Sequence, residues 1–161
     1  MNSLLWYDYE TSGLDPAADR AIQVGWVKTD PGMEKLDEAQ SQLIQVPDDV
    51  IPSPRALLVH HIPPEIHQSK GITEAELAFR LEQLMQPQTL IAGYNSRRFD
   101  DRFTQHIFYR CLRDPYAWQW TDGRGRFDLY PVVLTYYAIA PNCILWPEDL
   151  NGEPRFKLDR I

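Results

Sequence analysis

The stretch LLWYDYE at residues 4–10 is the part of the sequence that most constrains the fold. Its apolar first half is typical of a strand buried within a sheet, and two acids stand at its end. Because residues i and i+2 of a strand point to the same face, the carboxylates of Asp8 and Glu10 can approach one metal ion. Two solvated acids at a strand exit would leave the same pattern, so this motif alone does not establish a metal site.

The segments around this strand predict an α/β domain. Four strands are expected, at residues 4–10, 21–28, 42–46 and 89–94, and four helices, at 55–59, 73–85, 99–107 and 129–140. Thr73 and Glu76 form a capping box at the start of the second helix, and Asp128 is a suitable N-cap for the last. The proline-rich stretch 47–64 is interpreted as a mostly irregular connection, and residues 156–161 as the start of a further helix. This order indicates a mixed central sheet flanked by helices.

Length and composition limit the class of protein. The chain is expected to be a single domain, residues 1–161, and its 43% of hydrophobic residues can bury a core. No apolar run approaches the roughly 18–20 residues of a membrane span, and no signal peptide is visible. Cys111 and Cys143 form neither a metal-binding pattern nor a disulfide framework, so a cytoplasmic protein is expected.

The net charge of −7 sets a condition on any nucleic-acid function, because proteins that hold nucleic acids by charge alone are usually basic. The basic residues must then be concentrated locally, and the segment 97–127 meets this condition. Its arginines are Arg97, Arg98, Arg102, Arg110, Arg113, Arg124 and Arg126, and its aromatic residues include Phe103, Tyr109, Tyr116, Trp118 and Trp120. Rings that stack on bases and arginines that contact phosphates suit a single strand, although Phe103 and Trp118 also suit a core.

A second acidic motif, GYNSRRFDD at residues 93–101, follows the fourth expected strand. The chain turns at Asn95 and places Asp100 and Asp101 at the start of a helix. Successive residues of a helix lie about 100° apart, so the two acids are not expected to face the same site. Either acid could instead cap the helix and complement its dipole.

Taken in order, these motifs resemble the exonuclease I family of DEDD-type 3′→5′ exonucleases. The matching segments are DYET at 8–11, GYNSRRFDD at 93–101, YR at 109–110, DPYAW at 114–118 and WPE at 146–148. The similarity runs from about residue 6 to residue 158, which is nearly the whole chain. It implies a ribonuclease H-like α/β exonuclease fold and hydrolysis of single-stranded DNA from its 3′ end to 5′-mononucleotides, in DNA repair or recombination.

The resemblance also implies the catalytic residues and the cofactor. Asp8, Glu10 and Asp100 match the family's catalytic acids, with Asp8 and Glu10 as metal ligands, and Asp101 matches a residue outside the catalytic set. Two Mg²⁺ ions are implied, with Mn²⁺ as a substitute. Two divalent ions can activate water and stabilise charge during phosphodiester hydrolysis, and carboxylates suit both metals.

Substrate contacts and partners follow from the same resemblance. Glu10, Tyr116, Trp120 and Lys157 match positions that contact the DNA. Lys157 stands where the family commonly has an arginine, a change that keeps the charge but loses the bidentate fork. Single-stranded DNA is therefore the expected partner, with a single-stranded-DNA-binding protein as a candidate second one. The protein is expected to be a monomer that does not associate with membranes.

One family motif has no counterpart in the sequence. The family's general-base histidine and last aspartate are arranged as H-x-A-x-x-D, and none of the four histidines of this sequence begins such a pattern. His60 and His61 are expected to be surface or packing residues. The C-terminal part of the domain is therefore expected beyond residue 161, and the chain alone is expected to be catalytically incomplete. A single-stranded nucleic-acid-binding module and an RNA-trimming exonuclease of the same fold stay open as alternatives. A ribonuclease H-like domain without activity would be expected to lack the acids, which are present here.

Overall fold

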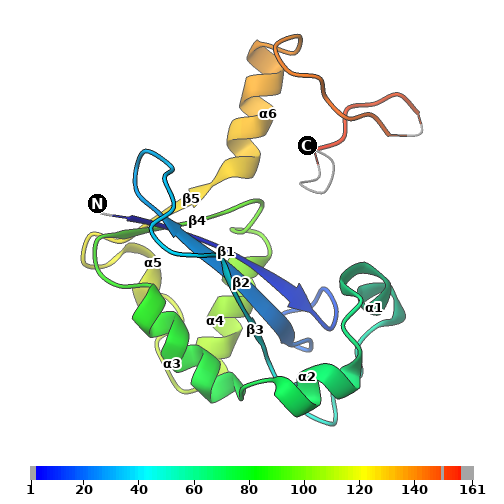
Figure 1. The fold of residues 1–161 in the computed structure, drawn as a ribbon, viewed down its shortest axis with the longest axis vertical. Coiled ribbons are helices and arrows are strands. Elements are labelled where there is room, and N and C mark those ends of the chain that lie inside the picture. Colours follow the sequence, from blue (N-terminus) through cyan, green and yellow to red (C-terminus); the bar gives the residue numbers. More distant parts are fainter. Residues whose placement is uncertain (1–2, 150, 157–161) are drawn as a thin grey trace.

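The computed structural model describes residues 3–149 and 151–156. Its centre is a five-stranded mixed sheet with the strand order β3-β2-β1-β4-β5 (Figure 1). The strands are β1 (Ser3–Thr11), β2 (Ala21–Thr29), β3 (Gln40–Leu43), β4 (Thr89–Gly93) and β5 (Gly125–Asp128). β1 lies in the middle of the sheet, in agreement with the buried strand predicted from its apolar sequence.

The pairing of β1 determines which segments meet at the end of the sheet. β1 is antiparallel to β2 and parallel to β4, with Trp6 opposite Ala92. β4 and β5 are also parallel, with Gly93 opposite Asp128. Because parallel strands end at the same edge, the residues that follow β4 and β5 lie on the side of the sheet where β1 ends in acids.

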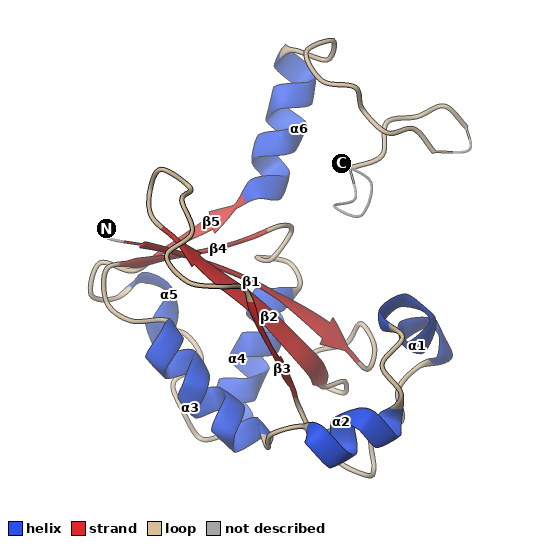
Figure 2. Ribbon diagram, viewed as in Figure 1, coloured by secondary structure: helices blue, strands red, loops and turns tan. Residues whose placement is uncertain are grey.

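The part of the chain that the structure describes contains six helices (Figure 2). They are α1 (Pro54–His60), α2 (Pro64–Lys70), α3 (Glu74–Leu84), α4 (Asp100–Arg110), α5 (Ala117–Trp120) and α6 (Leu129–Ile139). Figure 2 shows α3 and α4 on the same side of the sheet. The core lies between them and the sheet and is filled by Leu5, Tyr7 and Tyr9 from β1, Leu77 and Leu81 from α3, and Phe103 and Ile107 from α4.

The alternate residues of β1 face the opposite way. Trp6 and Asp8 line a groove of about 400 Å³ on the other face of the sheet, together with Val27 of β2 and Tyr94 after β4. One strand therefore contributes to the core with one set of side chains and to an open groove with the other.

The two predicted helix caps are confirmed. The hydroxyl of Thr73 accepts a hydrogen bond from the backbone of Glu76 at 3.2 Å, and the Glu76 carboxylate accepts one from the Thr73 backbone at 2.8 Å. Asp128 caps α6 by accepting a bond from the backbone of Tyr130 at 3.0 Å. β3 lies at 40–43 rather than at 42–46, where it pairs with β2, and Ile44 just beyond it forms an isolated bridge with Ile72.

The sequence does not predict three elements, α2, α5 and β5. α2 begins with Pro64 at its first helical position, in a stretch whose prolines also suit a loop. α5 and β5 have four residues each, which is too short for a periodic pattern. β5 exists because it pairs with β4, and that pairing leaves no trace in four local residues.

α6 extends away from the sheet (orange in Figure 1). Although it is rich in apolar residues, none of them is buried. Beyond it, the rings of Trp146 and Phe156 pack against Tyr137. The helix predicted at residues 156–161 falls on residues that are mostly outside the described ones. Among the described helices, none is long and apolar enough to cross a membrane.

Candidate active site

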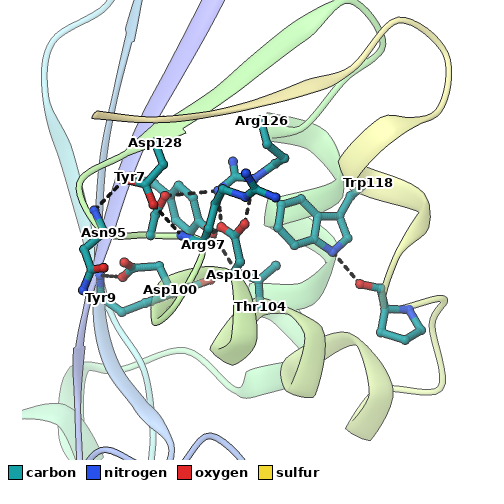
Figure 3. Close-up of polar contacts among 12 residues, drawn as sticks. Tyr7, Tyr9, Asn95, Arg97, Asp100, Asp101, Thr104, Trp118, Arg126 and Asp128 are labelled. Atoms are coloured by element: carbon teal, nitrogen blue, oxygen red, sulfur yellow. Dashed lines mark hydrogen bonds and ion pairs between the residues drawn. The ribbon is translucent and has the colours of Figure 1, made fainter. Parts of the chain in front are cut away.

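Asp8 and Asp100 meet at the edge of the sheet where β1 and β4 end. Asp8 stands near the end of β1, and Asp100 is the first residue of α4, which follows β4. The backbone N–H of Tyr9 donates a hydrogen bond to the Asp100 carboxylate at 3.0 Å and so fixes it beside β1 (Figure 3). Asp100 is 2% exposed, whereas Asp8 is open to solvent at the groove. The structure thus brings together two acids that the sequence predicted from separate motifs.

Gly93 and Asn95 shape the turn that carries Asp100 to this position. A Cβ atom at Gly93 would lie 2.6 Å from Cβ of Ser96 and 3.2 Å from the carbonyl oxygen of Tyr7, so a larger residue would push the turn away from β1. Asn95 has a φ of 56°, a left-handed conformation that asparagine tolerates better than most residues. Gly93 and Asn95 therefore permit the close approach of this turn to the strand.

Burial and mutual repulsion raise the pKa values of the paired acids. Burial raises the pKa of Asp100 to about 8, and the nearby charge of Asp8 adds to this effect. Burial also raises the pKa of Asp8. At neutral pH Asp100 therefore keeps a proton unless a cation compensates the two charges. This pair of oxygen ligands fits a divalent ion of the Mg²⁺ or Mn²⁺ type.

Glu10 borders the pair and lines a separate pocket. The register of β1 and β2 shifts between Glu10 and Thr11, as at a β-bulge, and such shifts change the direction of side chains. Burial, and after it the charge of Asp8, raises the pKa of Glu10. Within residues 3–149 and 151–156, however, no three acidic, histidine or cysteine side chains form a group that could hold a metal ion. The described residues therefore offer a carboxylate pair with Glu10 beside it, not a closed set of three ligands.

Asp101 points into the core, away from this pair. Its carboxylate accepts a hydrogen bond from the Tyr7 hydroxyl at 2.8 Å and one from Nε of Arg126 at 2.8 Å. Asp100 and Asp101 thus point in different directions, Asp100 toward Asp8 and Asp101 into the core, in agreement with their expected angular separation on the helix. The charge of Asp101 is already compensated by Arg126.

The arginine-rich segment divides into two groups. Four arginines form ion pairs within the chain: Arg110 with Glu74, Arg113 with Glu82, Arg124 with Asp122 and Arg126 with Asp101. Arg97, Arg98 and Arg102 are exposed, and their side chains form no ion pair with any described residue. The interpretation of the whole segment as a phosphate-binding patch is wrong for Arg126, whose side chain is 1% exposed.

Tyr116 and Trp120 lie at the other edge of the sheet. They are 63% and 59% exposed, and α5 leads into β5 and packs against it. The backbone N–H of Gln88, just before β4, donates to the carbonyl of Asp122, so this is the edge where β4 begins. Trp118 is buried, as is Phe103, in agreement with the core role considered for both. Lys157 lies outside the described residues.

The sequence did not predict the walls of the pocket beside Glu10. The pocket has a volume of about 290 Å³ and is lined by Leu14 after β1, by Val59 and His60 of α1, and by Phe99 before α4. Nδ1 of His60 accepts a hydrogen bond from the backbone of Ile62 at 2.9 Å, and its Nε2 has no partner among the described residues. Three separate segments form these walls, so no local pattern could have revealed them.

Comparison with known proteins adds to this geometry. A family model described as Exonuclease, RNase_T, matches residues 5–159. Exodeoxyribonuclease I of Escherichia coli is 40% identical over 161 residues, which are 99% of this chain and 34% of that protein. The structure of E. coli exonuclease I in complex with a dT13 oligonucleotide matches with a TM-score of 0.94 and 40% identity over 99% of this chain and 35% of the other. An ExoI/SSB-Ct complex matches with a TM-score of 0.95, 40% identity and the same coverage. The chain spans about a third of the length of these relatives.

Proposed function

Because the chain belongs to the RNase_T exonuclease family, we propose that it is the carboxylate-bearing part of a 3′→5′ exonuclease that degrades single-stranded DNA. Membership of this family and the ribonuclease H-like exonuclease fold were both predicted from the ordered motifs, and both are confirmed. Enzymes of this family generally depend on divalent metal ions. The observation that carries the proposal is the pairing of Asp8 and Asp100 at adjacent strand ends beside the pocket that Glu10 lines.

In the proposed function, Asp8 and Asp100 hold a divalent cation, with Glu10 as a further ligand on the pocket side. The raised pKa of Asp100 supports this role, since a cation would take the place of the proton between the two carboxylates. Two Mg²⁺ ions, or Mn²⁺ in their place, would activate water and stabilise the charge that develops on the phosphate. The residues of the chain contribute the negative charge and its fixed position at the end of β1.

The pocket beside Glu10 is suited to the terminal nucleotide. Leu14, Val59 and Phe99 give it apolar walls against which a base can pack, as bases do on aromatic side chains in single-strand binding sites. Glu10 lies in the same pocket, where its carboxylate can accept a hydrogen bond from a sugar hydroxyl. This arrangement would place the last phosphodiester bond near Asp8 and Asp100.

The rest of the strand would follow exposed side chains away from the site. Arg97, Arg98 and Arg102 lie around the start of α4, beside Asp100, and are available for phosphates. Tyr116 and Trp120 would stack on bases farther along, at the edge where β4 begins. We include Lys157 as a contact near the 3′ end on the family resemblance alone. The proposed path thus crosses the sheet from one edge to the other.

The cellular role is proposed on the same basis. A relative is seen in an ExoI/SSB-Ct complex, which supports a single-stranded-DNA-binding protein as a partner of this chain as well. We further propose a monomeric enzyme that works in the cytoplasm in DNA repair or recombination.

The proposal is tested by cleavage of a 5′-labelled oligonucleotide with Mg²⁺. Two proteins are compared, the 161-residue chain and a version extended to the length of the relatives. The extended protein should shorten single-stranded DNA from its 3′ end, one nucleotide at a time. The 161-residue chain should bind DNA with little turnover, because loss of a general base typically costs about 10²–10⁴ in rate.

Three outcomes would change the proposal. Binding without cleavage by both proteins would favour the alternative of a single-stranded nucleic-acid-binding module. Faster cleavage of RNA than of DNA would favour an RNA-trimming enzyme of the same fold. Robust turnover by the 161-residue chain that is lost on Asp8→Asn would show that a residue within it, such as His60, supplies the missing base.

A further inference from the structure

β5 has only four residues, yet two of them hold the segment that carries Asp100. Arg126 and Asp128 stand two residues apart, so their side chains leave the strand on the same face. Both contact residues 95–101, which form the turn after β4 and the first residues of α4 (Figure 3). No local pattern marks this role, because the contacts join residues 25 to 33 positions apart.

Arg126 holds the segment from the core side. Its Nε donates to Asp101 at 2.8 Å, and its Nη2 pairs with the other oxygen of the same carboxylate and reaches Ser96 Oγ at 3.3 Å. The guanidinium carbon lies over the rings of Tyr7 and Trp118, at 5.7 and 5.2 Å from their centroids. A planar fork fixed at two oxygens and between two rings can barely move, so it fixes Asp101 as well.

Asp128 holds the segment from its other end. One carboxylate oxygen accepts a hydrogen bond from the backbone of Asn95 at 2.8 Å, and the other accepts one from the backbone of Arg97 at 3.2 Å. Asn95 has a left-handed backbone conformation, which persists only where its surroundings support it. Asp128 therefore supports the turn at its left-handed residue, in addition to capping α6.

Asp100 lies between these two points of attachment, and Asp8 is fixed through the same network. Asp101 also accepts a hydrogen bond from the hydroxyl of Tyr7, the residue before Asp8, at 2.8 Å. The backbone of Tyr9, the residue after Asp8, donates to Asp100 at 3.0 Å. The residues on both sides of Asp8 are thus tied to Asp100 or to its neighbour.

We propose that Arg126 and Asp128 are positioning residues that keep the β4–α4 turn in place, so that Asp100 faces Asp8 before any cation binds. This inference rests on the proposed function, because it assigns the two residues a role at that metal site. Neither side chain touches the proposed metal or substrate in this arrangement. They act through Asp101 and through the backbone of Asn95 and Arg97.

The test measures the affinity of the 161-residue chain for Mn²⁺ by electron paramagnetic resonance of the free ion. Arg126→Gln should weaken Mn²⁺ binding roughly 10- to 100-fold, the range found when residues that orient metal ligands are changed. Arg126→Lys keeps the charge but not the fork, and should fall between Arg126→Gln and the unchanged protein. Asp128→Asn, which loses one of the two fixed acceptors, should also weaken binding.

Arg110→Gln is the matched control. Arg110 is the last residue of α4, the helix that begins with Asp100, and it forms an ion pair with Glu74 through two hydrogen bonds. Both Arg110→Gln and Arg126→Gln are expected to lower the unfolding temperature, but Arg110→Gln should leave Mn²⁺ affinity unchanged. A fall in affinity that accompanies every loss of stability, including that of Arg110→Gln, would overturn the positioning role.

Asp8→Asn separates this inference from the proposed function. If the Asp8→Asn variant binds Mn²⁺ as tightly as the unchanged chain, the metal site itself is wrong and the proposed function fails. If binding depends on Asp8 but is unaltered by Arg126→Gln and Asp128→Asn, only the positioning role is wrong. Should Arg126→Gln not fold, Arg126→Lys and Asp128→Asn decide the question in the same way.

Discussion

The two faces of the central sheet differ in what covers them. On one face, Leu5, Tyr7 and Tyr9 of β1 are buried beneath α3 and α4. On the other, Trp6 and Asp8 of the same strand line an open groove, and α6, which borders the groove at Leu129, has no buried residue. The closed face carries the packing, and the open face carries Asp8 at the end where Asp100 approaches it from α4.

This difference shows how a single strand can combine stability with chemistry. The buried residues of β1 tie it to α4 through Tyr7 and Tyr9, whose hydroxyls contact Asp101 and Thr104. Asp8, on the opposite face, is therefore held at a fixed place although it does not belong to the core itself. Changes on the two faces should therefore have separable effects, and the following predictions test that separation from the largest expected effect to the smallest.

Asp8→Asn should have the largest effect, on the open face. In the protein extended to the length of its relatives, we expect cleavage of single-stranded DNA to fall roughly 10³-fold or more, because the variant loses a charge that we propose holds the cation. Binding of the strand should change little. Tyr9→Phe, the next residue on the closed face, should cost only about 1 kcal/mol of folding free energy and keep most of the activity. An Asp8→Asn enzyme with more than about a tenth of the original rate would contradict this role.

Phe103→Ala should have the largest effect on folding. Phe103 is fully buried under the closed face, so we expect the free energy of unfolding in urea to fall by about 3–5 kcal/mol. Leu134→Ala on α6, where the residue is 37% exposed, should change it by less than about 1 kcal/mol. Similar losses for the two variants would show that α6 is packed as firmly as the closed face.

The two tryptophans of α5 repeat the contrast on one short helix. Trp120→Ala should weaken binding of a fluorescent single-stranded oligonucleotide by about 1–3 kcal/mol, because an exposed ring offers a stacking platform for a base. Trp118→Ala should lower stability instead, since Trp118 is buried against Phe108. Unchanged affinity together with reduced stability in Trp120→Ala would place this ring in the core.

Metal affinity should rise with pH by about tenfold per unit between roughly pH 5 and 8, if one proton leaves for each ion bound. The pKa of Asp100 is raised from 3.8 to about 8, so the metal-free folded protein holds a proton that the unfolded chain has already lost. For the same reason, stability without metal should fall as the pH rises through this interval. Mn²⁺ titrations and thermal unfolding at several pH values would reveal this, and a pH-independent affinity would speak against a proton shared at the site.

The central strands of the sheet and the two acids at the site can be predicted from short local stretches of the sequence. The apolar run of β1 and the GYN turn depend on neighbours in sequence, so LLWYDYE and GYNSRRFDD predict both elements and the side chains at their ends. β5, the ion pair of Arg126 and the pocket at His60 could not be predicted in this way. Each depends on a partner from a distant segment, and an arginine that is buried in an ion pair looks in sequence like one that contacts phosphate.

The most direct test of the proposed metal site is the position of the ion on the chain. Fe²⁺ bound in place of Mg²⁺, with ascorbate and peroxide, cuts the backbone close to where it sits, and the fragments can be mapped by mass spectrometry. We predict cuts near residues 8–10 and 93–100, suppressed by excess Mg²⁺ and absent in Asp8→Asn. Cuts confined to other segments, such as the acidic loop at residues 30–38, or cuts that persist in Asp8→Asn, would contradict a metal site at the ends of β1 and β4.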